Sequence, residues 1–264
     1  MTAVVDHAAP VAAPLAPVTA TLHAMFGTDD LPGLTAGLLV TDEAGWVSAS
    51  ELADGTRIPA LLAAAQHRWQ ASPHAGAALA WKAYTYWLAL PVVLGWASAR
   101  RVPLLYASDV LVRLDDHRPL MTVGLRRSTS VAVLPSDPLA AAGVPEVRVV
   151  ADETELLGAL RASLLDGHLT PMLDAIHRQA RIGGRTLMGS VASGVAYGIL
   201  RAADAVPGSS VETIGTLLRA LGIDDLIELE RGPSGELTVQ RKTCCLAFTL
   251  PRPKICTGCC IRKP

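Results

Sequence analysis

All five cysteines of this 264-residue chain lie near its C-terminal end. They are Cys244, Cys245, Cys256, Cys259 and Cys260. Cysteines that serve only as small apolar side chains are expected to be spread through the core, so this clustering calls for a chemical explanation. Four thiolates at short loop spacings form a soft, anionic set of ligands. Such a set suits an iron–sulfur cluster or a zinc ion.

The spacing C-C-x10-C-x2-C favours a cluster over a single ion. Zinc ribbons and fingers usually hold one ion between two C-x2-C turns. Neighbouring side chains of an extended segment point to opposite sides, so the adjacent pair Cys244-Cys245 chelates one small ion poorly. Two sulfide-bridged irons form a larger target that separated thiolates can reach. The sequence therefore predicts a 2Fe–2S cluster, with zinc as the alternative metal.

The residues around the cysteines resemble a known C-terminal motif. Arg241-Lys242-Thr243-Cys244-Cys245-Leu246 is followed by Leu250-Pro251 and then by Cys256-Thr257-Gly258-Cys259. This pattern is similar to the end of the FhuF-like ferric-siderophore reductases, in which it follows a largely helical domain. The resemblance implies that Cys244, Cys245, Cys256 and Cys259 hold the cluster. Cys260 departs from the family pattern and is an alternative to Cys259 as the fourth ligand.

The same resemblance implies a one-electron reductase of ferric siderophores. The cluster would accept an electron from a donor and pass it to siderophore-bound Fe(III). Hard oxygen ligands bind ferric iron more tightly than ferrous iron, so reduction releases the metal. The sequence contains no G-x-x-x-x-G-K-[ST] motif and no G-x-G-x-x-G after a strand. We therefore expect an external electron donor, either a ferredoxin or a reduced flavin.

Two other functions agree with the same cysteines. A ferredoxin-like carrier would serve another enzyme, but such carriers are usually small and acidic, whereas about 240 residues accompany this motif. A zinc-stabilised protein that binds a siderophore or a partner without redox activity is the rival from a different class. Visible colour and reducibility separate that rival from a reductase.

Charge is distributed unevenly along the chain, whose formal net charge is −1. Residues 241–264 contain six basic and no acidic residues, whereas the other 240 contain 17 basic and 24 acidic ones. Nearby cations stabilise an anionic cluster and favour its reduced form. Arg241, Lys242, Arg252 and Lys254 are therefore candidates for steering an anionic iron complex, with a solvated basic tail as the alternative. The near-neutral net charge of the whole chain argues against nucleic-acid binding.

Two segments bear on the compartment. Residues 1–18 are rich in Ala and Pro and have no basic n-region, so we expect a disordered tail and no signal peptide. Ala75 to Ser98 is long enough to span a bilayer, but Lys82 lies inside it and Pro91 breaks it, which favours a buried core helix. Clustered cysteines without a secretion signal indicate the reducing cytoplasm. A monomer, with peripheral association with the inner membrane as a further option, is the expected state.

Hydrophobic spacing predicts an α+β fold in which helices predominate. Helices are expected over residues 48–69, 81–96, 154–165, 170–182, 186–203 and 211–221. Strands are expected at 105–114, 120–125 and 131–134, and a hairpin at 226–230 and 236–240. The chain would thus comprise the tail 1–18, a helix-rich domain 19–240 with a β insertion near 104–150, and the cluster-binding segment 241–264. The expected architecture is a helical bundle with a small antiparallel sheet.

Several residues predict local features of these elements. Ser48 and Glu51 form a capping box for one helix, and Pro171 marks the start of another. The small residue Gly194 allows its helix a close neighbour. The seven histidines show no metal-binding spacing. His168 is a candidate for coupling proton uptake to reduction, with a role in the core as the alternative.

Overall fold

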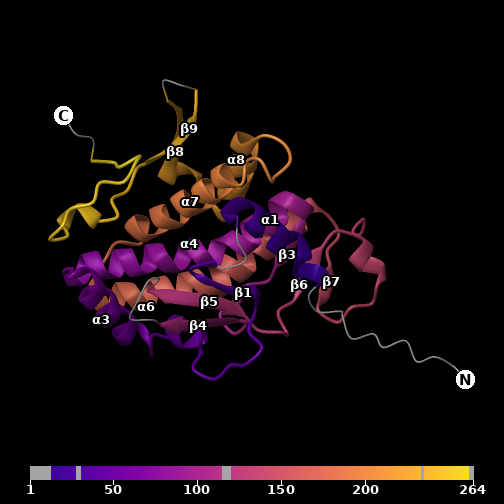
Figure 1. The fold of residues 1–264 in the computed structure, drawn as a ribbon, viewed down its shortest axis with the longest axis horizontal. Helices are drawn as coiled ribbons and strands as arrows, with labels where there is room; N and C mark the ends of the chain where they lie inside the picture. The colour runs from indigo at the N-terminus through magenta and orange to yellow at the C-terminus, as the bar shows by residue number, and fades with distance from the viewer. Residues whose placement is uncertain (1–12, 28–30, 115–119, 233–234, 262–264) are drawn as a thin grey trace, which may run out of the picture.

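The computed structural model describes residues 13–27, 31–114, 120–232 and 235–261. Helices predominate in it, which confirms the predicted fold class (Figure 1). The α-helices are α1 (Ala16–Phe26), α2 (Ser50–Ala53), α3 (Ile58–Trp69), α4 (Pro73–Ala99), α5 (Glu153–Leu160), α6 (Thr170–Ala180), α7 (Gly184–Arg201) and α8 (Ser210–Leu221). A π-helix, Arg161–Leu169, connects α5 to α6.

The strands form three small sheets instead of one. They are β1 (Leu34–Leu39), β2 (Val47–Ser48), β3 (Arg101–Pro103), β4 (Val110–Leu114), β5 (Met121–Leu125), β6 (Val131–Val133), β7 (Val147–Val149), β8 (Ile227–Arg231) and β9 (Leu237–Arg241). The sheet orders are β1-β5-β4-β2, β3-β6-β7 and β8-β9. The predicted pairs β4–β5 and β8–β9 are antiparallel. However, β1 pairs with β5 and β6 with β7 in parallel, so the sheets are mixed and not purely antiparallel.

Helix α4 forms the centre of the molecule. It contacts α1, α3, α6 and α7 as well as β3 and β5. The Ser72 hydroxyl caps its start by accepting a hydrogen bond from the Ala75 N–H (3.3 Å). Its length and hydropathy would suit a membrane span, but 72% of its most apolar window is buried inside the protein. The prediction of a buried core helix is therefore confirmed.

Pro91 does not break α4, contrary to the expectation from sequence. The helix continues through it to Ala99. Proline costs a helix one hydrogen bond and a steric clash. Here the surrounding helices bury Leu90, Pro91 and Val92 completely, and this packing outweighs the local cost.

Helix α6 begins at Thr170 with Pro171 in its first turn, as predicted, but no loop separates it from the helix before it. The π-helix carries the chain from α5 into α6 without a break. Its wider turn is marked by the Thr170 N–H, which donates to the Leu165 carbonyl five residues earlier. Helical backbone angles at Leu169 then lead directly into α6.

The N-terminal third differs from prediction in two places. Residues 1–12 of the expected tail lie outside the described residues, whereas residues 13–18 are helical and include the buried Leu15 and Val18. The expected helix 48–69 is divided between α2 and α3. Ser48 ends β2, so it does not cap a helix, although its hydroxyl accepts a hydrogen bond from the Ser50 N–H (3.3 Å).

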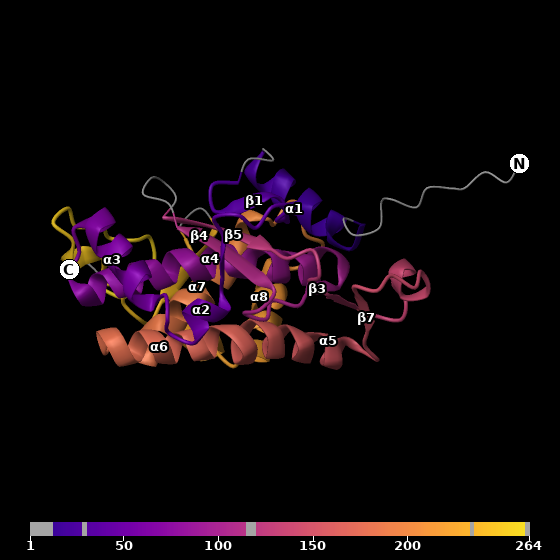
Figure 2. The same cartoon turned by 90° about the horizontal axis from the view of Figure 1, so that it is seen from below.

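Helix α7 packs closely along α4, as its small residues predict. A Cβ at Gly194 would lie 3.7 Å from the Tyr86 Cα, and the Trp81 indole N–H donates to the Leu187 carbonyl (2.8 Å). The cysteine segment follows the β8–β9 hairpin and lies at the end of the molecule where α3 and the start of α4 meet (Figures 1 and 2). Helices α4 and α7 therefore position the side chains that face the cysteine segment.

Candidate metal centre

Hydrogen bonds fold the cysteine segment back onto the end of β9. The Arg241 N–H donates to the Gly258 carbonyl (2.9 Å), and the Gln240 side-chain amide donates to the Cys259 carbonyl (3.0 Å). Gln240 and Arg241 lie four and three residues before Cys244 in sequence. These two bonds therefore bring the last cysteines beside the first ones.

Gly258 makes the tight turn that the sequence predicts within C-T-G-C. Its φ is +64°, a conformation that side chains rarely adopt, and a Cβ there would lie 1.7 Å from the Val239 carbonyl oxygen. The Cys259 N–H closes the turn by donating to the Cys256 carbonyl (3.2 Å). No residue other than glycine fits this position.

The thiols approach one another in pairs. The Cys245 thiol lies beside that of Cys256, and the Cys260 thiol lies beside that of Cys244. Cys259 is close enough for its charge to act on both Cys256 and Cys260. In the part of the chain that the structure describes, no three Cys, His, Asp or Glu side chains are gathered tightly enough to hold a single ion. The five thiols thus form one connected group of neighbours.

The Cys245–Cys256 pair favours one negative charge and resists a second. Burial raises the pKa of Cys245, but the Ala247 N–H, Lys82 and Arg241 outweigh it and hold that pKa below its usual value. Burial and the charge of Cys245 raise the pKa of Cys256 to about 11. A metal cation bound to both sulfurs would offset the repulsion between the two thiolate charges, because metal ligation deprotonates thiols.

Unmet hydrogen-bond donors lie next to the cysteine pair. Three buried side-chain atoms in the described residues lack a partner, namely Arg241 Nε, Arg241 Nη1 and Thr243 Oγ1. Arg241 is 3% exposed, and its Nη2 donates to the Ser190 hydroxyl (3.0 Å). Gly189 makes room for Thr243, since a Cβ there would lie 1.8 Å from Thr243 Oγ1. A buried guanidinium with unmet donors is costly, so this site suits an anionic acceptor.

These observations fit a four-thiolate 2Fe–2S cluster. Two irons take four thiolates as two pairs, whereas a structural zinc ion needs four ligands around one centre. Arg241, Thr243 and Lys82 offer donors and positive charge to an anionic centre. The choice between Cys259 and Cys260 as the fourth ligand stays a prediction.

The four candidate steering cations occupy different environments. Arg241 is buried, but it lines a cavity together with Cys256. Lys242 forms an ion pair with Glu228 (2.8 Å). Arg252 and Lys254 are exposed on the cysteine segment. That these four cations attract an anionic complex stays a prediction.

His168 is part of the core and is not a member of the metal centre. Its Nδ1 is 2.8 Å from the Leu105 carbonyl oxygen, and its Nε2 is 2.6 Å from the Tyr84 hydroxyl. The carbonyl can only accept, so Nδ1 carries the proton and Nε2 accepts from tyrosine. Burial lowers the pKa of His168 to about 4, which keeps the ring neutral. The structure favours the alternative role in the core.

Lys82 is the contributor that the sequence did not reveal. It projects from α4 into the walls of two cavities that both include Tyr86 and Cys256. In the sequence, Lys82 is only an interruption of an apolar stretch. Its position beside the thiols depends on the packing of residues 245–256 against α4, for which no local pattern exists.

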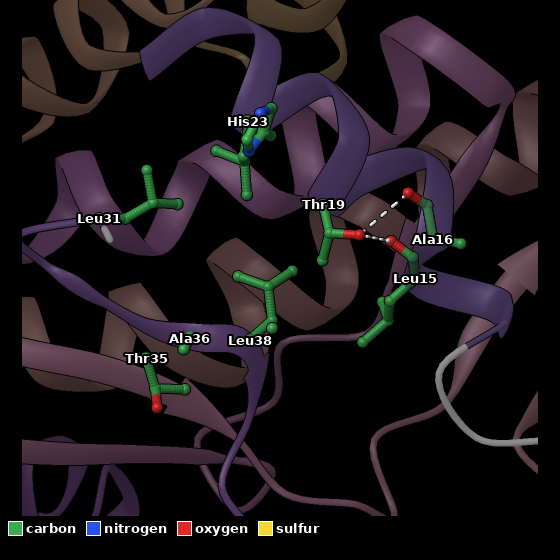
Figure 3. A pocket seen from close by; sticks show the side chains of 10 residues that line it. Leu15, Ala16, Thr19, His23, Leu31, Thr35, Ala36 and Leu38 are labelled. Carbon is green, nitrogen blue, oxygen red and sulfur yellow. Dashed lines mark hydrogen bonds between the residues drawn. The ribbon is translucent and has the colours of Figure 1, made fainter. Parts of the chain in front are cut away.

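A cavity of about 470 Å³ lies elsewhere, between α1 and β1 (Figure 3). Its walls are mainly apolar, and the Thr19 hydroxyl is bonded to the Leu15 and Ala16 carbonyls. It includes no residue of the cysteine segment. This cavity therefore does not belong to the metal centre.

A helix-rich domain that ends in paired thiols defines the chain as a candidate metal-dependent redox protein. The family model described as "Ferric iron reductase FhuF-like transporter" matches residues 79–214, which is more than half of the chain. The chain belongs to this FhuF-like family. The match ends before Cys244, so it does not depend on the cysteine motif. No curated protein matches the chain.

Two solved structures show a weak likeness to the chain. They are the aerobactin synthetase IucA from a hypervirulent pathotype of Klebsiella pneumoniae (16% identity, TM-score 0.43) and its ATP-bound form (17% identity, TM-score 0.44). Each alignment covers 69% of this chain and 33% of the synthetase, so the chain spans about one third of the length of those proteins. Scores this low carry no argument about function.

Proposed function

We propose that this protein is a cytoplasmic ferric-siderophore reductase whose 2Fe–2S cluster is held by Cys244, Cys245, Cys256 and Cys259. The observation that carries the proposal is the approach of Cys245 to Cys256 and of Cys244 to Cys260 beside the unmet donors of Arg241. The choice of Cys259 over Cys260 rests on the spacing C-C-x10-C-x2-C. Membership of a ferric iron reductase family supports it independently, because that match lies outside the cysteine segment.

When bound, the cluster supplies reversible one-electron transfer. The residues of the chain hold it, offset its negative charge with Arg241 and Lys82, and keep three of its four sulfur ligands half-buried near the surface. The ferric complex gains one electron per turnover from an external ferredoxin or reduced flavin, and no bond within the organic ligand changes. Fe(II) then leaves, because hard oxygen ligands hold it weakly.

The cytoplasmic location is part of the proposal. All five cysteines lie between residues 244 and 260, and Cys245 lies beside Cys256 as Cys244 does beside Cys260. Thiols this close would form disulfides in an oxidising compartment. A reducing compartment keeps them available for metal.

The test is the visible absorption spectrum of protein purified anaerobically and reconstituted with iron and sulfide, before and after dithionite. Bands that bleach on reduction are expected. Ferric trihydroxamate and ferric tricatecholate complexes are then assayed with a ferrous-specific chelator as the trap. Cys245→Ser should remove both colour and activity while retaining helical circular dichroism. Thr249→Ser, an exposed conservative change in the same segment, is the matched control.

Two results would contradict the proposal. One is a colourless reconstituted protein that contains zinc, which would indicate a structural metal and a binding role. The other is a Cys245→Ser variant that reduces either complex at the parental rate.

A further inference from the structure

The cysteine segment, residues 244–261, carries an unusual share of the exposed apolar side chains. Six large hydrophobic residues are exposed in the described part of the chain, and three of them, Phe248, Ile255 and Ile261, lie in this segment. Their exposed fractions are 40%, 53% and 42%. Exposed apolar side chains that gather in one place mark a surface to which another molecule binds.

A backbone hydrogen bond brings two of these residues close together beside the metal centre. The Lys254 N–H donates to the Ala247 carbonyl (3.0 Å), and Ile255 and Phe248 directly follow these two residues in sequence. Ile255 in turn directly precedes Cys256, and both line a cavity of about 450 Å³ between α4 and the cysteine segment. A molecule that contacts Phe248 and Ile255 is therefore held next to a predicted cluster ligand.

Positive charge accompanies these apolar side chains. Arg252 and Lys254 are exposed and line the same cavity of about 260 Å³, so they lie on one side of the segment. None of the ion pairs in the described part of the chain involves either residue. Residues 241–264 contain no acidic residue. Arg252 and Lys254 are not the cations that offset the cluster charge, so they are available to attract an acidic surface.

The position of this surface favours a protein partner over a small ligand or a membrane. A small ligand is held in a concave site that buries most of it, whereas residues 251–255 are exposed in succession. Cys256, Cys259 and Cys260 follow them and are partly exposed. A membrane on this surface would cover the metal centre and separate it from water-soluble reactants. A soluble electron carrier would instead bring its own redox centre to the cysteines.

We propose that residues 248–261 form the docking surface for the electron donor, and that this donor is a small acidic one-electron carrier protein of the ferredoxin or flavodoxin type. Its acidic face meets Arg252 and Lys254, and its apolar contacts are Phe248 and Ile255. One electron leaves the reduced carrier and enters the oxidised cluster, and no bond forms or breaks. Weak electron-transfer complexes bury less than roughly 1,200 Å² in total, so a short segment can supply one side of the contact. This inference rests on the proposed function and names its partner.

The test measures how fast such carriers reduce the cluster. A plant-type 2Fe–2S ferredoxin and a flavodoxin, each fully reduced and freed of excess reductant, are mixed anaerobically with the oxidised, cluster-loaded protein. Stopped-flow absorption gives the second-order rate constant. For the wild-type protein we expect this constant to fall about tenfold as salt rises from about 0.02 to about 0.5 M, because salt screens the attraction between opposite charges.

Three variants separate the contribution of charge from that of apolar contact. Arg252→Gln and Lys254→Gln should each lower the rate constant about two- to fivefold at low salt and weaken its salt dependence, as loss of a charge at the rim of an interface does. Phe248→Ser should lower it by a similar factor at low and at high salt, because salt does not screen apolar contact. Arg148→Gln and Val149→Ser are the matched controls. Both residues are exposed on β7, at the opposite end of the molecule from the cysteine segment, so these changes should not affect the constant (Figure 2).

A small reductant checks that each variant holds an accessible cluster. Reduced methyl viologen is a cation, so removal of positive charge from the protein should not slow its reaction with the cluster. Its rate constant should be no lower in any variant than in the wild-type protein. The visible spectrum before mixing gives the cluster content of each variant.

Two results would overturn the inference. One is a wild-type rate constant with both carriers in Arg252→Gln, Lys254→Gln and Phe248→Ser. The other is binding to phosphatidylglycerol vesicles that Lys254→Gln and Phe248→Ser abolish while the carrier rates stay unchanged, which would assign the surface to an anionic membrane. In either case a spectrum that bleaches with dithionite, together with ferric reduction by the wild-type protein, would leave the proposed function intact.

Discussion

Arg241 occupies an unusual environment for a cation. It is buried, it bonds to a serine hydroxyl, and two of its nitrogens lack partners among the described residues. Burying such a group without an anion costs several kcal/mol, on the order of the loss seen when a buried ion pair is broken. The residue therefore makes physical sense only together with the negative charge that the neighbouring thiolates supply.

Replacing Arg241 should lower the reduction potential of the cluster. Arg241→Gln removes a positive charge beside a centre that becomes more negative on reduction, so the reduced form is disfavoured. A tenfold change in this one-electron equilibrium corresponds to about 60 mV, and we expect a fall of about that size. Potentiometric titration of the visible spectrum measures it.

Two related variants provide the controls for this measurement. Arg241→Lys keeps the charge and should give an intermediate potential. Arg252→Gln removes an exposed charge from the same segment and should leave the potential unchanged. An unchanged potential in Arg241→Gln would refute the role assigned to this residue.

The fourth ligand can be decided by single substitutions. We expect Cys259→Ser to lose most of its iron and sulfide and Cys260→Ser to retain both. The reason is that the turn through Gly258 brings Cys256 and Cys259 together, with the Cys259 N–H bonded to the Cys256 carbonyl. Iron and sulfide content per protein, measured after identical reconstitution, tests this. The reverse result would assign the ligand to Cys260, which lies beside Cys244.

At the scale of elements, the β8–β9 hairpin and the C-T-G-C turn form one unit. Gly258→Ala should disrupt it, because a Cβ would collide with the Val239 carbonyl of β9. We expect iron content to fall severalfold while helical circular dichroism is retained. Gly235→Ala is the matched control, since Gly235 also has positive φ (+86°) but nothing lies within 4 Å of its Cβ position. Equal iron content in the two variants would mean that the collision is unimportant.

Elements that depend on neighbours in sequence were predictable. The β4–β5 and β8–β9 pairs join adjacent strands, and the cysteine spacing itself specifies a metal site. By contrast, β1 pairs in parallel with β5, about ninety residues later, and this contact leaves no local pattern. Hydrophobic spacing predicted a helix over 81–96 that contains Pro91, but the continuation of α4 from Pro73 to Ala99 depends on burial in the tertiary structure, which overrides the local preference of proline.

The candidate site likewise has features that the sequence predicted and features that it did not. The thiols could be named from their spacing, and so could the tight turn at Gly258. The burial of Arg241 and the approach of Lys82 could not, because both depend on how α4 and α7 pack against the cysteine segment. A basic residue in a basic stretch suggests a solvated surface, and only the fold shows that Arg241 points inward.

At the scale of the whole molecule, His168 links three separate parts of the core. Through Tyr84 it reaches α4, through Leu105 it reaches the loop after β3, and it belongs to the π-helix itself. The ring accepts one of these hydrogen bonds and donates the other, so it must remain neutral. Its pKa of about 4 in the folded protein lies below the value of about 6.5 expected in the unfolded chain.

Global stability should therefore fall on acidification. Above pH 6.5 the His168 ring is neutral in the folded and the unfolded state. Below pH 6.5 the unfolded chain binds a proton that the folded protein does not bind until about pH 4, so the unfolded state is favoured. This residue alone should cost about 2 kcal/mol of unfolding free energy between pH 7 and pH 5. Urea unfolding of the Cys245→Ser protein, which removes the metal, measures the change.

His168→Asn supplies the comparison for this effect. It retains a donor for the Leu105 carbonyl and does not titrate in this range. The variant is expected to be less stable than the parent at pH 7, and this difference should shrink by about the same 2 kcal/mol at pH 5. Parallel pH dependence in the two proteins would exclude His168 as the source.

The cysteine segment buries little of its own surface. From residue 244 to residue 261, only Cys245, Ala247 and Leu250 are buried. Iron–sulfur bonds would therefore hold residues 244–261 in place. Copies of the protein that lack iron would expose this segment to proteases. Under the proposed function, each iron released can complete another copy. Iron recovery would then start slowly in a starved cell and accelerate as more copies survive.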